Sequence, residues 1–409
     1  RWVPGAASFM DDEMAIFEEI GVNYALWVWD PEWQPWNEGV NFLNFRYGSD
    51  PKSTVNIENE LQSTIVEYWA KNTLHPSSFS TQSNTNPGEN WLNDITNWLY
   101  LIDVNLSSET VDQIAESGYD MVVLDFIPSE ADNIDYPMAE VVAQFHNAPH
   151  PKKVIAYIDI GEAEEYRVYW QDDWEIGNPA WIVGNDPDGW AENYPVAFWA
   201  EAWQAIWLEN GGMLDQIGVA GFDGVYLDWV EAYSDENVVE AAQAEGVNPV
   251  YAMIEFVSFI SSNIKDECDD CVVIAQNAAE LVEYAEYAAT IDGLAQEQVW
   301  FDGGADNEPE GDCPLPRTDA DIDSDAYYDS LLPECQHQFD EFPESTLHVS
   351  SEEYLFFLKI AQEKDIPVFT VDYALIPENV AWTYATSRNL GFTPFVGNRA
   401  LDKFIAPVP

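Results

Sequence analysis

The stretch VIAYIDIGEAEEYRVYW, residues 154–170, holds the features that decide the fold. Val154 to Ile158 form a short apolar run, which is typical of a strand buried on both faces of a parallel sheet. Asp159 follows this run directly, Gly161 marks a sharp turn, and Glu162 comes immediately after the turn. Acidic groups just beyond a strand lie where parallel barrels keep their active sites, so the stretch predicts a strand that opens into a cleft.

The same pattern recurs along the chain, because short apolar segments alternate with segments of helical pattern and most of them end in a polar or acidic residue. The predicted strands are Trp98 to Ile102, Met121 to Leu124, Val154 to Ile158, Gly224 to Leu227, Val272 to Ala275, Gly293 to Gln296, Pro367 to Val371 and Thr393 to Val396. Such alternation indicates βα units and a parallel sheet. Eight units favour a closed (β/α)8 TIM barrel, an α/β fold, over an open sheet.

Composition divides the chain into three predicted parts. Residues 91–409 hold the barrel, including an acidic insertion at 302–344 whose only basic residue is Arg317. Residues 75–90, HPSSFSTQSNTNPGEN, are rich in Ser, Thr, Asn and Pro and read as a linker. We expect residues 1–74 to form a helix, a strand and a further helix, which is too little for a barrel. This extension is therefore expected to be the tail of a preceding domain.

Aromatic residues of this extension have two interpretations. The tryptophans are Trp27, Trp29, Trp33 and Trp36. They either stack on sugar rings at the end of an upstream glycosidase-like domain or pack against the second domain.

The net charge is extreme, yet the chain is predicted to fold. It has 409 residues, 75 acidic and 14 basic, with a formal net charge of −61, while 47% of it is hydrophobic and 14% aromatic. Disordered acidic chains lack such apolar content. Self-repulsion of this size destabilises a compact state in dilute buffer, but at about 1 M salt the Debye length falls to roughly 3 Å. Because the carboxylates are spread along the chain, they favour salt adaptation over a dedicated calcium or polycation surface.

Charge and hydropathy also bear on partners and location. A nucleic-acid partner is excluded, since this chain cannot assemble the basic patch that phosphates need. No stretch approaches the ~20 apolar residues of a membrane span, and no signal peptide or lipidation motif is visible. The chain begins at Arg1, which fits a processed or truncated product. We expect an extracellular or cell-surface protein in a high-salt environment; the sequence predicts no oligomeric state.

Four cysteines form two local groups, Cys268 with Cys271 and Cys313 with Cys335. The even count favours two disulfides over free thiols or zinc, because one Cys-x-x-Cys pair alone is a weak metal signal.

The residues at the strand ends indicate carboxylate chemistry. No histidine follows a predicted strand, which argues against a histidine base or a zinc cluster, and no glycine-rich phosphate loop is present. We therefore expect no metal and no cofactor. Two positioned carboxyl groups are what glycosidic bond cleavage needs, one to protonate the leaving oxygen and one to attack or to activate water.

Four segments resemble the successive signatures of glycoside hydrolase family 114, the endo-α-1,4-polygalactosaminidase-like family with bacterial and archaeal relatives. They are IAYIDIGEAEEYRVYW (155–170), ENYPVAFWAEAW (192–203), GFDGVYLDWVEAY (221–233) and TIDGLAQE (290–297). The resemblance runs from about Trp98 to Phe395. It implies a (β/α)8 barrel and an endo-acting glycosidase for an amino-sugar-containing polysaccharide such as an α-1,4-galactosamine polymer. The alternative is an inactive barrel that serves as a carbohydrate-binding or cell-surface structural module.

The resemblance also implies a catalytic pair. Asp228 matches the family's catalytic aspartate at the end of the fourth strand, and Glu297 matches its glutamate at the end of the sixth. We expect Asp228 to act as nucleophile or base and Glu297 as general acid/base; the alternative for each is a structural role. Their separation predicts the stereochemistry, about 5–5.5 Å for retention and about 6.5–9.5 Å for inversion. Asp159 stands where relatives carry a small hydroxyl residue, and this extra carboxylate is expected to raise a neighbouring pKa.

Further side chains are predicted to bind substrate from the strand ends and the loop after Gly161. They are Asp125, Tyr157, Asp159, Glu162, Arg167, Tyr226, Asn277 and Asp372. Glu162 and Arg167 either form an ion pair that orders the loop or contact the substrate directly.

Further tryptophans and acidic residues lie outside the predicted strands, the first group in the long segment after the third strand. Trp170, Trp174, Trp181 and Trp190 are predicted sugar platforms. Trp199, Trp203 and Trp207 repeat every four residues and are expected to form one helix face that packs on the barrel. The alternating acids Asp319, Asp321, Asp323 and Asp325 lack the glycine and glutamate of an EF-hand, which favours a solvated acidic loop over a calcium site.

Overall fold

The computed structural model describes residues 46–47, 55–56, 90–102, 104–127, 136–187, 189–302, 312–322, 324–342 and 345–408. The chain divides into two compact units, Arg1–Gly88 and Glu89–Pro409. In the first, β1 (Arg46–Tyr47) pairs antiparallel with β2 (Val55–Asn56). The predicted helices and strand of residues 1–74, the four tryptophans among them and residues 75–89 of the linker lie outside the described residues. The division into extension, linker and barrel stays a prediction.

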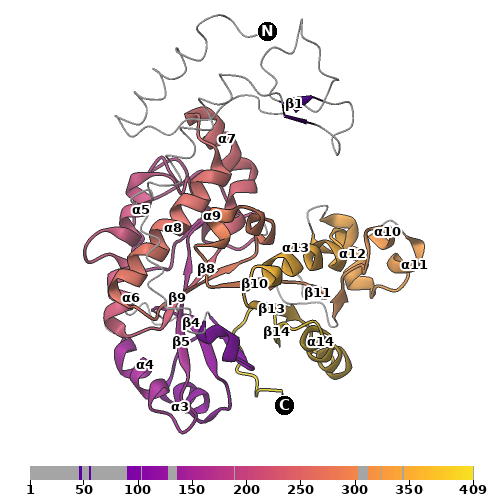
Figure 1. Cartoon of the computed structure of the whole chain (residues 1–409), viewed down its shortest axis with the longest axis horizontal. Coiled ribbons are helices and arrows are strands. Elements are labelled where there is room, and N and C mark those ends of the chain that lie inside the picture. Colours follow the sequence, from indigo (N-terminus) through magenta and orange to yellow (C-terminus); the bar gives the residue numbers. More distant parts are fainter. Residues whose placement is uncertain are drawn as a thin grey trace, which may run out of the picture. The chain divides into compact units, whose positions relative to one another are not determined.

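The second unit is built on an eight-stranded parallel sheet (Figure 1). Its strands are β3 (Trp98–Leu101), β4 (Met121–Asp125), β5 (Lys153–Asp159), β8 (Gly224–Asp228), β9 (Val272–Gln276), β10 (Gly293–Glu297), β13 (Val368–Tyr373) and β14 (Thr393–Gly397). They pair in chain order, and nearly every residue in them is buried because helices cover the outside of the sheet. All eight predicted strands are therefore confirmed.

The sheet curls until its first and last strands meet. The indole Nε1 of Trp98 in β3 donates to the carbonyl oxygen of Thr393 in β14 at 3.0 Å, and the Trp98 ring lies 5.9 Å from that of Phe395. Tyr226 and Phe369 also pack on Trp98 inside the sheet. Side chains thus fill the interior and join the edges, and the predicted (β/α)8 barrel is confirmed.

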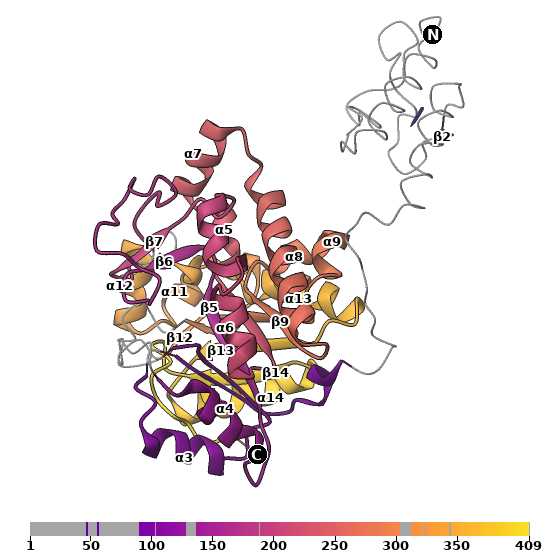
Figure 2. The same ribbon diagram turned by 90° about the vertical axis from the view of Figure 1, so that its left-hand side faces the viewer.

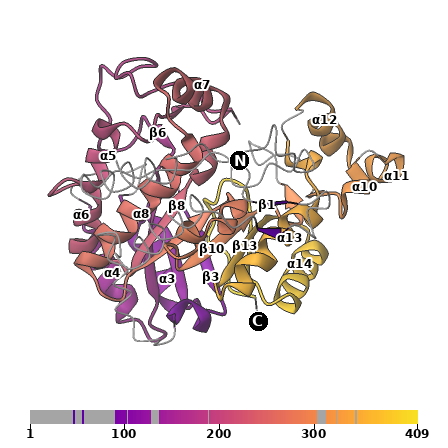
Figure 3. The same ribbon diagram turned by 45° about the horizontal axis from the view of Figure 1, so that its top comes forward.

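Helices and short 3-10 turns surround the sheet, as Figures 2 and 3 show from two further directions. They are η1 (Trp91–Asp94), α3 (Ser108–Glu116), α4 (Met138–His146), α5 (Glu201–Leu208), α6 (Met213–Ala220), η3 (Val230–Ser234), α7 (Glu236–Glu245), α8 (Pro249–Glu267), η4 (Ala279–Glu283), α9 (Ala285–Ala288), η5 (Thr346–His348), α13 (Ser351–Glu363) and α14 (Pro377–Asn389). Several begin at a polar cap whose side chain accepts a backbone N–H, such as Ser107, Asp235, Asn248 and Ser350. No helix of the described part is both long and apolar enough to cross a membrane.

Helix α5 packs on the barrel through two tryptophans. Trp203 and Trp207 are buried, and the indole of Trp203 donates to the carbonyl oxygen of Ile160 at 3.0 Å. The predicted helix face is confirmed for these two residues. Trp199 comes before the helix begins and donates to Glu245 at 2.8 Å, so its assignment to that face was wrong.

The acidic insertion has a small core of its own. Between β11 (Phe301–Asp302) and β12 (Cys313–Pro314) on one side and α12 (Pro333–Glu341) on the other, Cys313 and Cys335 form a disulfide beside Tyr327. A second disulfide joins Cys268 and Cys271 after α8. Both predicted disulfides are therefore present.

The alternating aspartates of the insertion are not a loop. Asp319 and Asp321 lie in α10 (Asp319–Ile322), and Asp325 begins α11 (Asp325–Tyr328), while Asp323 is outside the described residues. The Asp319 carboxylate accepts from Ser350, and Asp321 accepts the backbone N–H of Thr318. Two short helices thus stand at the described aspartates in place of the predicted solvated loop.

Candidate active site

A cavity of about 700 Å³ lies where the carboxyl ends of the barrel strands converge. Tyr157 and Asp159 line it from β5, Asp228 from β8 and Glu297 from β10, and Tyr373 closes it from β13. Side chains at the last positions of parallel strands meet at one face of a barrel. Residues as distant in sequence as Tyr157 and Tyr373 therefore share one pocket.

Asp228 is the last residue of β8, and its carboxyl group is held from two directions. The hydroxyl of Tyr157 donates to Oδ2 at 2.5 Å, and the backbone N–H of Trp229 donates to Oδ1 at 2.8 Å. Burial, followed by the negative charge of Glu297, raises the pKa of Asp228 to about 7, although the hydrogen bonds from Tyr157 and from the backbone of Trp229 act in the opposite direction. Asp228 can therefore change its ionisation near neutral pH.

Glu297 is the last residue of β10 and accepts hydrogen bonds on both oxygens. Gln276 donates to Oε2 at 2.6 Å and Asn277 donates to the same atom at 3.1 Å. The hydroxyl of Tyr373 donates to Oε1. The backbone N–H of Glu297 in turn donates to Asn277 at 3.0 Å, so Glu297 is fixed by residues at the ends of β9 and β13.

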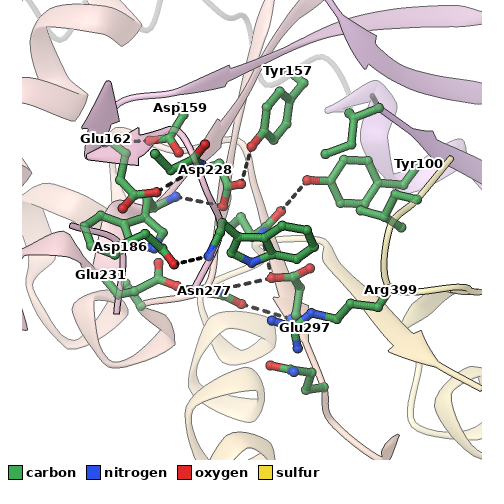
Figure 4. A pocket seen from close by; sticks show the side chains of 18 of the residues that line it. Tyr100, Tyr157, Asp159, Glu162, Asp186, Asp228, Glu231, Asn277, Glu297 and Arg399 are labelled. Atoms are coloured by element: carbon green, nitrogen blue, oxygen red, sulfur yellow. Dashed lines mark hydrogen bonds between the residues drawn. The ribbon is translucent and has the colours of Figure 1, made fainter. Parts of the chain in front are cut away.

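Asp228 and Glu297 act on each other although β9 lies between their strands. Figure 4 shows both carboxyl groups in the same pocket, and the charge of Glu297 is the second cause of the raised pKa of Asp228. The negative charge of Glu297 therefore disfavours the ionised form of Asp228.

The backbone turns sharply after each of these strands. Trp229, Asn277 and Gln298 follow β8, β9 and β10 and have φ values of 54°, 57° and 54°, in the left-handed region that non-glycine residues seldom adopt. Such conformations cost free energy and cluster at functional sites. Here they turn the chain away at once, so that the strand-end side chains face the pocket.

Acidic residues dominate the described wall of the pocket. Its ten carboxyl-bearing residues are Asp159, Glu162, Glu164, Asp186, Glu192, Asp228, Glu231, Glu280, Glu297 and Glu353, against the two cations Arg167 and Arg399. Arg167 is paired with Glu164 and Asp125, and Arg399 with Asp302. The site is therefore suited to a neutral or cationic ligand.

The sequence model of glycoside-hydrolase family GH114 matches residues 82–407. The chain belongs to this family. An uncharacterized protein of Deinococcus radiodurans is 33% identical over 293 residues, which cover 72% of this chain and 77% of that protein. An uncharacterized protein of Thermotoga maritima is 29% identical over 230 residues, covering 55% of this chain and 65% of that protein. Family membership makes this chain a glycosidase.

Two solved structures are also similar to this GH114 chain. The glycoside hydrolase domain of PelA from Pseudomonas aeruginosa has 16% sequence identity and a TM-score of 0.49, covering 76% of this chain and 97% of that one. Aspergillus fumigatus Ega3, solved as a complex with galactosamine, has 17% identity and a TM-score of 0.45, covering 76% of this chain and 93% of that one.

Five of the eight predicted substrate-binding residues of this GH114 glycosidase line the pocket: Tyr157, Asp159, Glu162, Arg167 and Asn277. Asp125, Tyr226 and Asp372 are not part of its wall. Tyr226 lies two residues before the end of β8 and is 0% exposed, one layer down inside the barrel.

Strand register removes Asp372 from the site. It precedes Tyr373, the last residue of β13, so its side chain points to the opposite face of the strand. There its Oδ1 accepts the backbone N–H groups of Trp300 and Phe301 at 2.6 and 3.0 Å. Asp125 instead lies behind the pocket wall, where it accepts from Arg167 at 2.7 Å.

The ion pair between Glu162 and Arg167 is not formed. A turn brings the N–H of Arg167 to the carbonyl oxygen of Glu164 at 3.1 Å, and this places the guanidinium on the Glu164 carboxylate, with contacts of 2.7 and 2.9 Å. The remaining guanidinium nitrogen, Nη1, forms an ion pair with the Asp125 carboxylate. Arg167 therefore stabilises the pocket wall through Glu164, and Glu162 is left without it.

Of the four predicted sugar platforms, Trp190 alone lines the pocket, with 39% of its surface exposed. Trp170 stacks on Tyr194 at 5.2 Å, and Trp174 meets Trp181 edge-on at 4.9 Å. These three tryptophans pack against the core, so their assignment as platforms was wrong.

Several residues of the pocket were missed by the sequence analysis. Glu231 lies three residues after Asp228, and its Oε1 accepts from Asn277 at 2.8 Å. Burial, followed by the charge of Asp228, raises its pKa well above the usual value. Its position inside the segment GFDGVYLDWVEAY was a usable signal. Gln276 directly follows a predicted strand, but only strand pairing brings it and Tyr373 to Glu297.

None of the described residues of the acidic insertion, 302, 312–322 and 324–342, lines the pocket. The insertion is joined to the pocket wall through buried Asp302, which accepts from Gln338 and Thr346 on one side and from Arg399 on the other. Among the described residues, no group of three or more His, Cys, Asp or Glu side chains is arranged to hold a metal ion.

Proposed function

We propose that this glycosidase is an endo-acting enzyme that cleaves a galactosamine-containing polysaccharide in high salt through Asp228 and Glu297. The observation that carries the proposal is the pair itself: Asp228 ends β8, Glu297 ends β10, both line one pocket, and the charge of Glu297 contributes to the raised pKa of Asp228. Glycosidic bond cleavage needs two such groups.

In the proposed reaction, Glu297 donates a proton to the glycosidic oxygen as the bond between that oxygen and the anomeric carbon breaks. Asp228, as a carboxylate, either attacks the anomeric carbon or takes a proton from the water that does so. The hydrogen bond from Tyr157 supports this role because it favours the ionised form of Asp228. The net reaction consumes one water and leaves two shorter chains.

The choice of an amino-sugar polymer is supported by the charge of the pocket. Ten acidic residues face two arginines that are already paired with acids. A polymer whose sugars carry ammonium groups is attracted to such a pocket, whereas a uronic-acid polymer is repelled. The resemblance to polygalactosaminidases points to the same substrate class.

The decisive experiment measures product release from α-1,4-galactosamine oligomers at molar salt by the wild type, Asp228→Asn and Glu297→Gln. We expect each variant to lose activity by about 10²–10⁴-fold, because each removes one group that acts in the transition state. Equal activity in all three proteins would overturn the catalytic assignment.

Thermal unfolding of the same three proteins is the control for correct folding of the variants. The pKa of Asp228 is raised in the folded state. The protein therefore loses stability as the pH rises from the ordinary pKa of an aspartate to about 7. Asp228→Asn removes this cost, and we expect it to unfold at the same or a higher temperature at pH 8. A loss of activity with no loss of stability is then a loss of catalysis.

Azide separates the two roles. In an alanine variant of the general acid/base of a retaining enzyme, azide replaces water and gives a glycosyl azide of retained configuration, whereas in a nucleophile variant it gives the opposite anomer. If Asp228 attacks the anomeric carbon, we expect Glu297→Ala to give the first product and Asp228→Ala the second; if Asp228 activates water instead, Glu297→Ala gives no azide of retained configuration. Nuclear magnetic resonance of the initial products distinguishes the anomers. The opposite pattern would exchange the roles of the two residues.

We further infer that the enzyme acts outside the cell or at its surface, in brine. The support is the net charge of −61 on a folded chain and the two disulfides of the barrel unit.

A further inference from the structure

Asp302 is a buried carboxylate where the acidic insertion meets the wall of the pocket. It ends β11 and is 2% exposed. Gln338 Nε2 and the hydroxyl of Thr346 donate to its Oδ2 at 2.8 and 2.6 Å. Gln298 Nε2 and Arg399 Nη1 donate to its Oδ1 at 2.9 and 3.2 Å. Three of these donors line the pocket and the fourth, Gln338, belongs to α12 of the insertion, so Asp302 ties the two together.

A disulfide joins the parts of the insertion that surround Asp302. In the short antiparallel pair of β11 and β12, Asp302 lies opposite Cys313. Cys313 is bonded to Cys335 in α12, and Gln338 follows Cys335 by three residues, on the same side of that helix. The disulfide therefore connects the strand beside Asp302 to the helix that supplies one of its donors.

A first route of contacts leads from Asp302 to the proposed catalytic pair through Arg399 and Tyr373. The guanidinium of Arg399 lies over the ring of Tyr373, with its Cζ 5.3 Å from the ring centroid. The hydroxyl of Tyr373 donates to Glu297 Oε1. Burial, followed by the charge of Glu297, raises the pKa of Tyr373 well above its usual value, and Arg399 acts in the opposite direction. A displaced guanidinium would therefore alter the hydroxyl that holds Glu297.

A second route is one residue long. Gln298 directly follows Glu297 and has a φ of 54°, in the left-handed region. Its backbone N–H donates to the carbonyl oxygen of Val371 at 2.7 Å, and its side chain donates to Asp302. Bonds from the backbone and from the side chain thus hold a conformation that costs free energy. Loss of the acceptor on Asp302 would loosen the turn that directs Glu297 into the pocket.

We propose that Asp302 is a positioning residue for the glycosidase reaction, and that the acidic insertion holds it in place through the insertion disulfide. Asp302 is not part of the described pocket wall, so it acts through Arg399 and Gln298 on the orientation of Glu297. The role of Glu297 rests on the proposed function, whereas the contacts belong to the insertion. A misplacement of about 1 Å can lower a rate about 10²-fold, so the effect falls on kcat more than on KM.

The first test is spectroscopic and does not depend on activity. Fluorotyrosine in place of Tyr373 gives one fluorine NMR resonance, whose chemical shift reports the surroundings of the ring and its hydroxyl. We expect Asp302→Asn to move this resonance, because the amide nitrogen of asparagine cannot accept the hydrogen bonds of one carboxylate oxygen. Asp223→Asn is the matched control. Asp223 also accepts from a cation, Lys153, and from the backbone N–H of Val154, but before β8 begins, so the resonance should not move.

Kinetics on α-1,4-galactosamine oligomers measure the consequence for the reaction. We expect Asp302→Asn to lower kcat about tenfold or more and to leave KM within about twofold. Gln338→Met removes one donor from the insertion side and leaves the pocket wall unchanged. We expect it to lower kcat about two- to fivefold. This milder variant tests the same contact if Asp302→Asn does not fold.

The two disulfides provide a further comparison. A double variant, Cys313→Ser with Cys335→Ser, opens the disulfide of the insertion and is expected to lower kcat and to move the fluorine resonance. Cys268→Ser with Cys271→Ser opens the disulfide that follows α8 and is the matched control, because neither cysteine lines the pocket. Equal kcat in the two double variants would overturn the part given to the insertion disulfide.

The outcomes separate the positioning role from the proposed function. A fluorine resonance that stays in place in Asp302→Asn, an equal shift in Asp223→Asn, or a change in KM in place of kcat would overturn the positioning role. If the wild type cuts no galactosamine oligomer while the resonance still moves in Asp302→Asn, the contacts from Asp302 to Tyr373 are confirmed and the proposed function is refuted.

Discussion

At the scale of single residues, the ionisation of the pocket depends on which donors reach which carboxyl group. Asp228 accepts from Tyr157 and feels the charge of Glu297, and these two neighbours shift its pKa in opposite directions. Asp159 receives two N–H groups, yet burial and the charge of Asp228 keep its pKa raised. Burial and neighbouring charge therefore outweigh the hydrogen bonds at both carboxyl groups.

The dependence of activity on pH should follow Asp228. As nucleophile or base it must be ionised, so kcat/KM is expected to fall as the pH drops through about 7. Tyr157→Phe removes the donor that favours the carboxylate, and we expect the midpoint of this fall to move to higher pH, with kcat reduced about 10-fold or more. The pH profiles of kcat/KM for the two proteins measure both effects. A midpoint that does not move in Tyr157→Phe would contradict the role given to this hydrogen bond.

At the scale of elements, the site depends on how closely the loop after β5 approaches the loop after β8. A Cβ atom on Gly161 would lie 2.3 Å from the carbonyl oxygen of Trp229 and 2.7 Å from the Cβ of Ala232. Ile160 also donates to the carbonyl oxygen of Asp228 at 3.2 Å. Glycine is thus required here by the approach of two chain segments, and the approach places Asp159 and Glu162 beside Asp228.

We expect Gly161→Ala to destabilise the protein by about 1–3 kcal/mol, because the backbone of η3 must move to admit the methyl group. The same movement displaces Asp228, so kcat/KM should fall as well. Gly118→Ala is the control, since its nearest neighbour would be 3.7 Å away, at an ordinary contact distance. Chemical denaturation and kinetics of both variants test this. Equal stability of Gly161→Ala and Gly118→Ala would refute the close packing.

At the scale of the whole molecule, the charge of −61 opposes the packing of a large apolar core. Lys153, one of few lysines, is already paired with Asp223, and Arg167 with Asp125 and Glu164. Because the chain has 75 acidic and 14 basic residues, repulsion between carboxylates outweighs attraction, and dissolved ions lower this repulsion.

We expect the midpoint of thermal unfolding to rise as salt is added, with most of the gain below about 1 M, because the Debye length shrinks from about 10 Å at 0.1 M to about 3 Å at 1 M. Differential scanning calorimetry across a series of KCl concentrations measures it. A continued linear rise above about 1 M would indicate salting-out of apolar surface in place of screening. A midpoint that is constant or falls with salt would refute salt adaptation.

Sequence alone determined the eight strands of the barrel and the positions of Asp228 and Glu297, because apolar runs and the residues that end them are local properties of the chain. The tertiary structure decided which neighbours the strand-end residues have. Asp372 and Tyr373 are adjacent, yet a one-residue difference in register turns the first away from the pocket and the second to Glu297.

The partner of Arg167 was also beyond the sequence. Glu162 and Glu164 are both close to Arg167 in the sequence. A turn hydrogen bond places the Arg167 guanidinium on the Glu164 carboxylate, and the Glu162 carboxylate lines the pocket instead. Trp170, Trp174 and Trp190 read alike as platforms, but only packing separates a core indole from an exposed one. Periodicity specifies which residues are buried or end a strand, whereas contacts between distant segments depend on closure of the barrel.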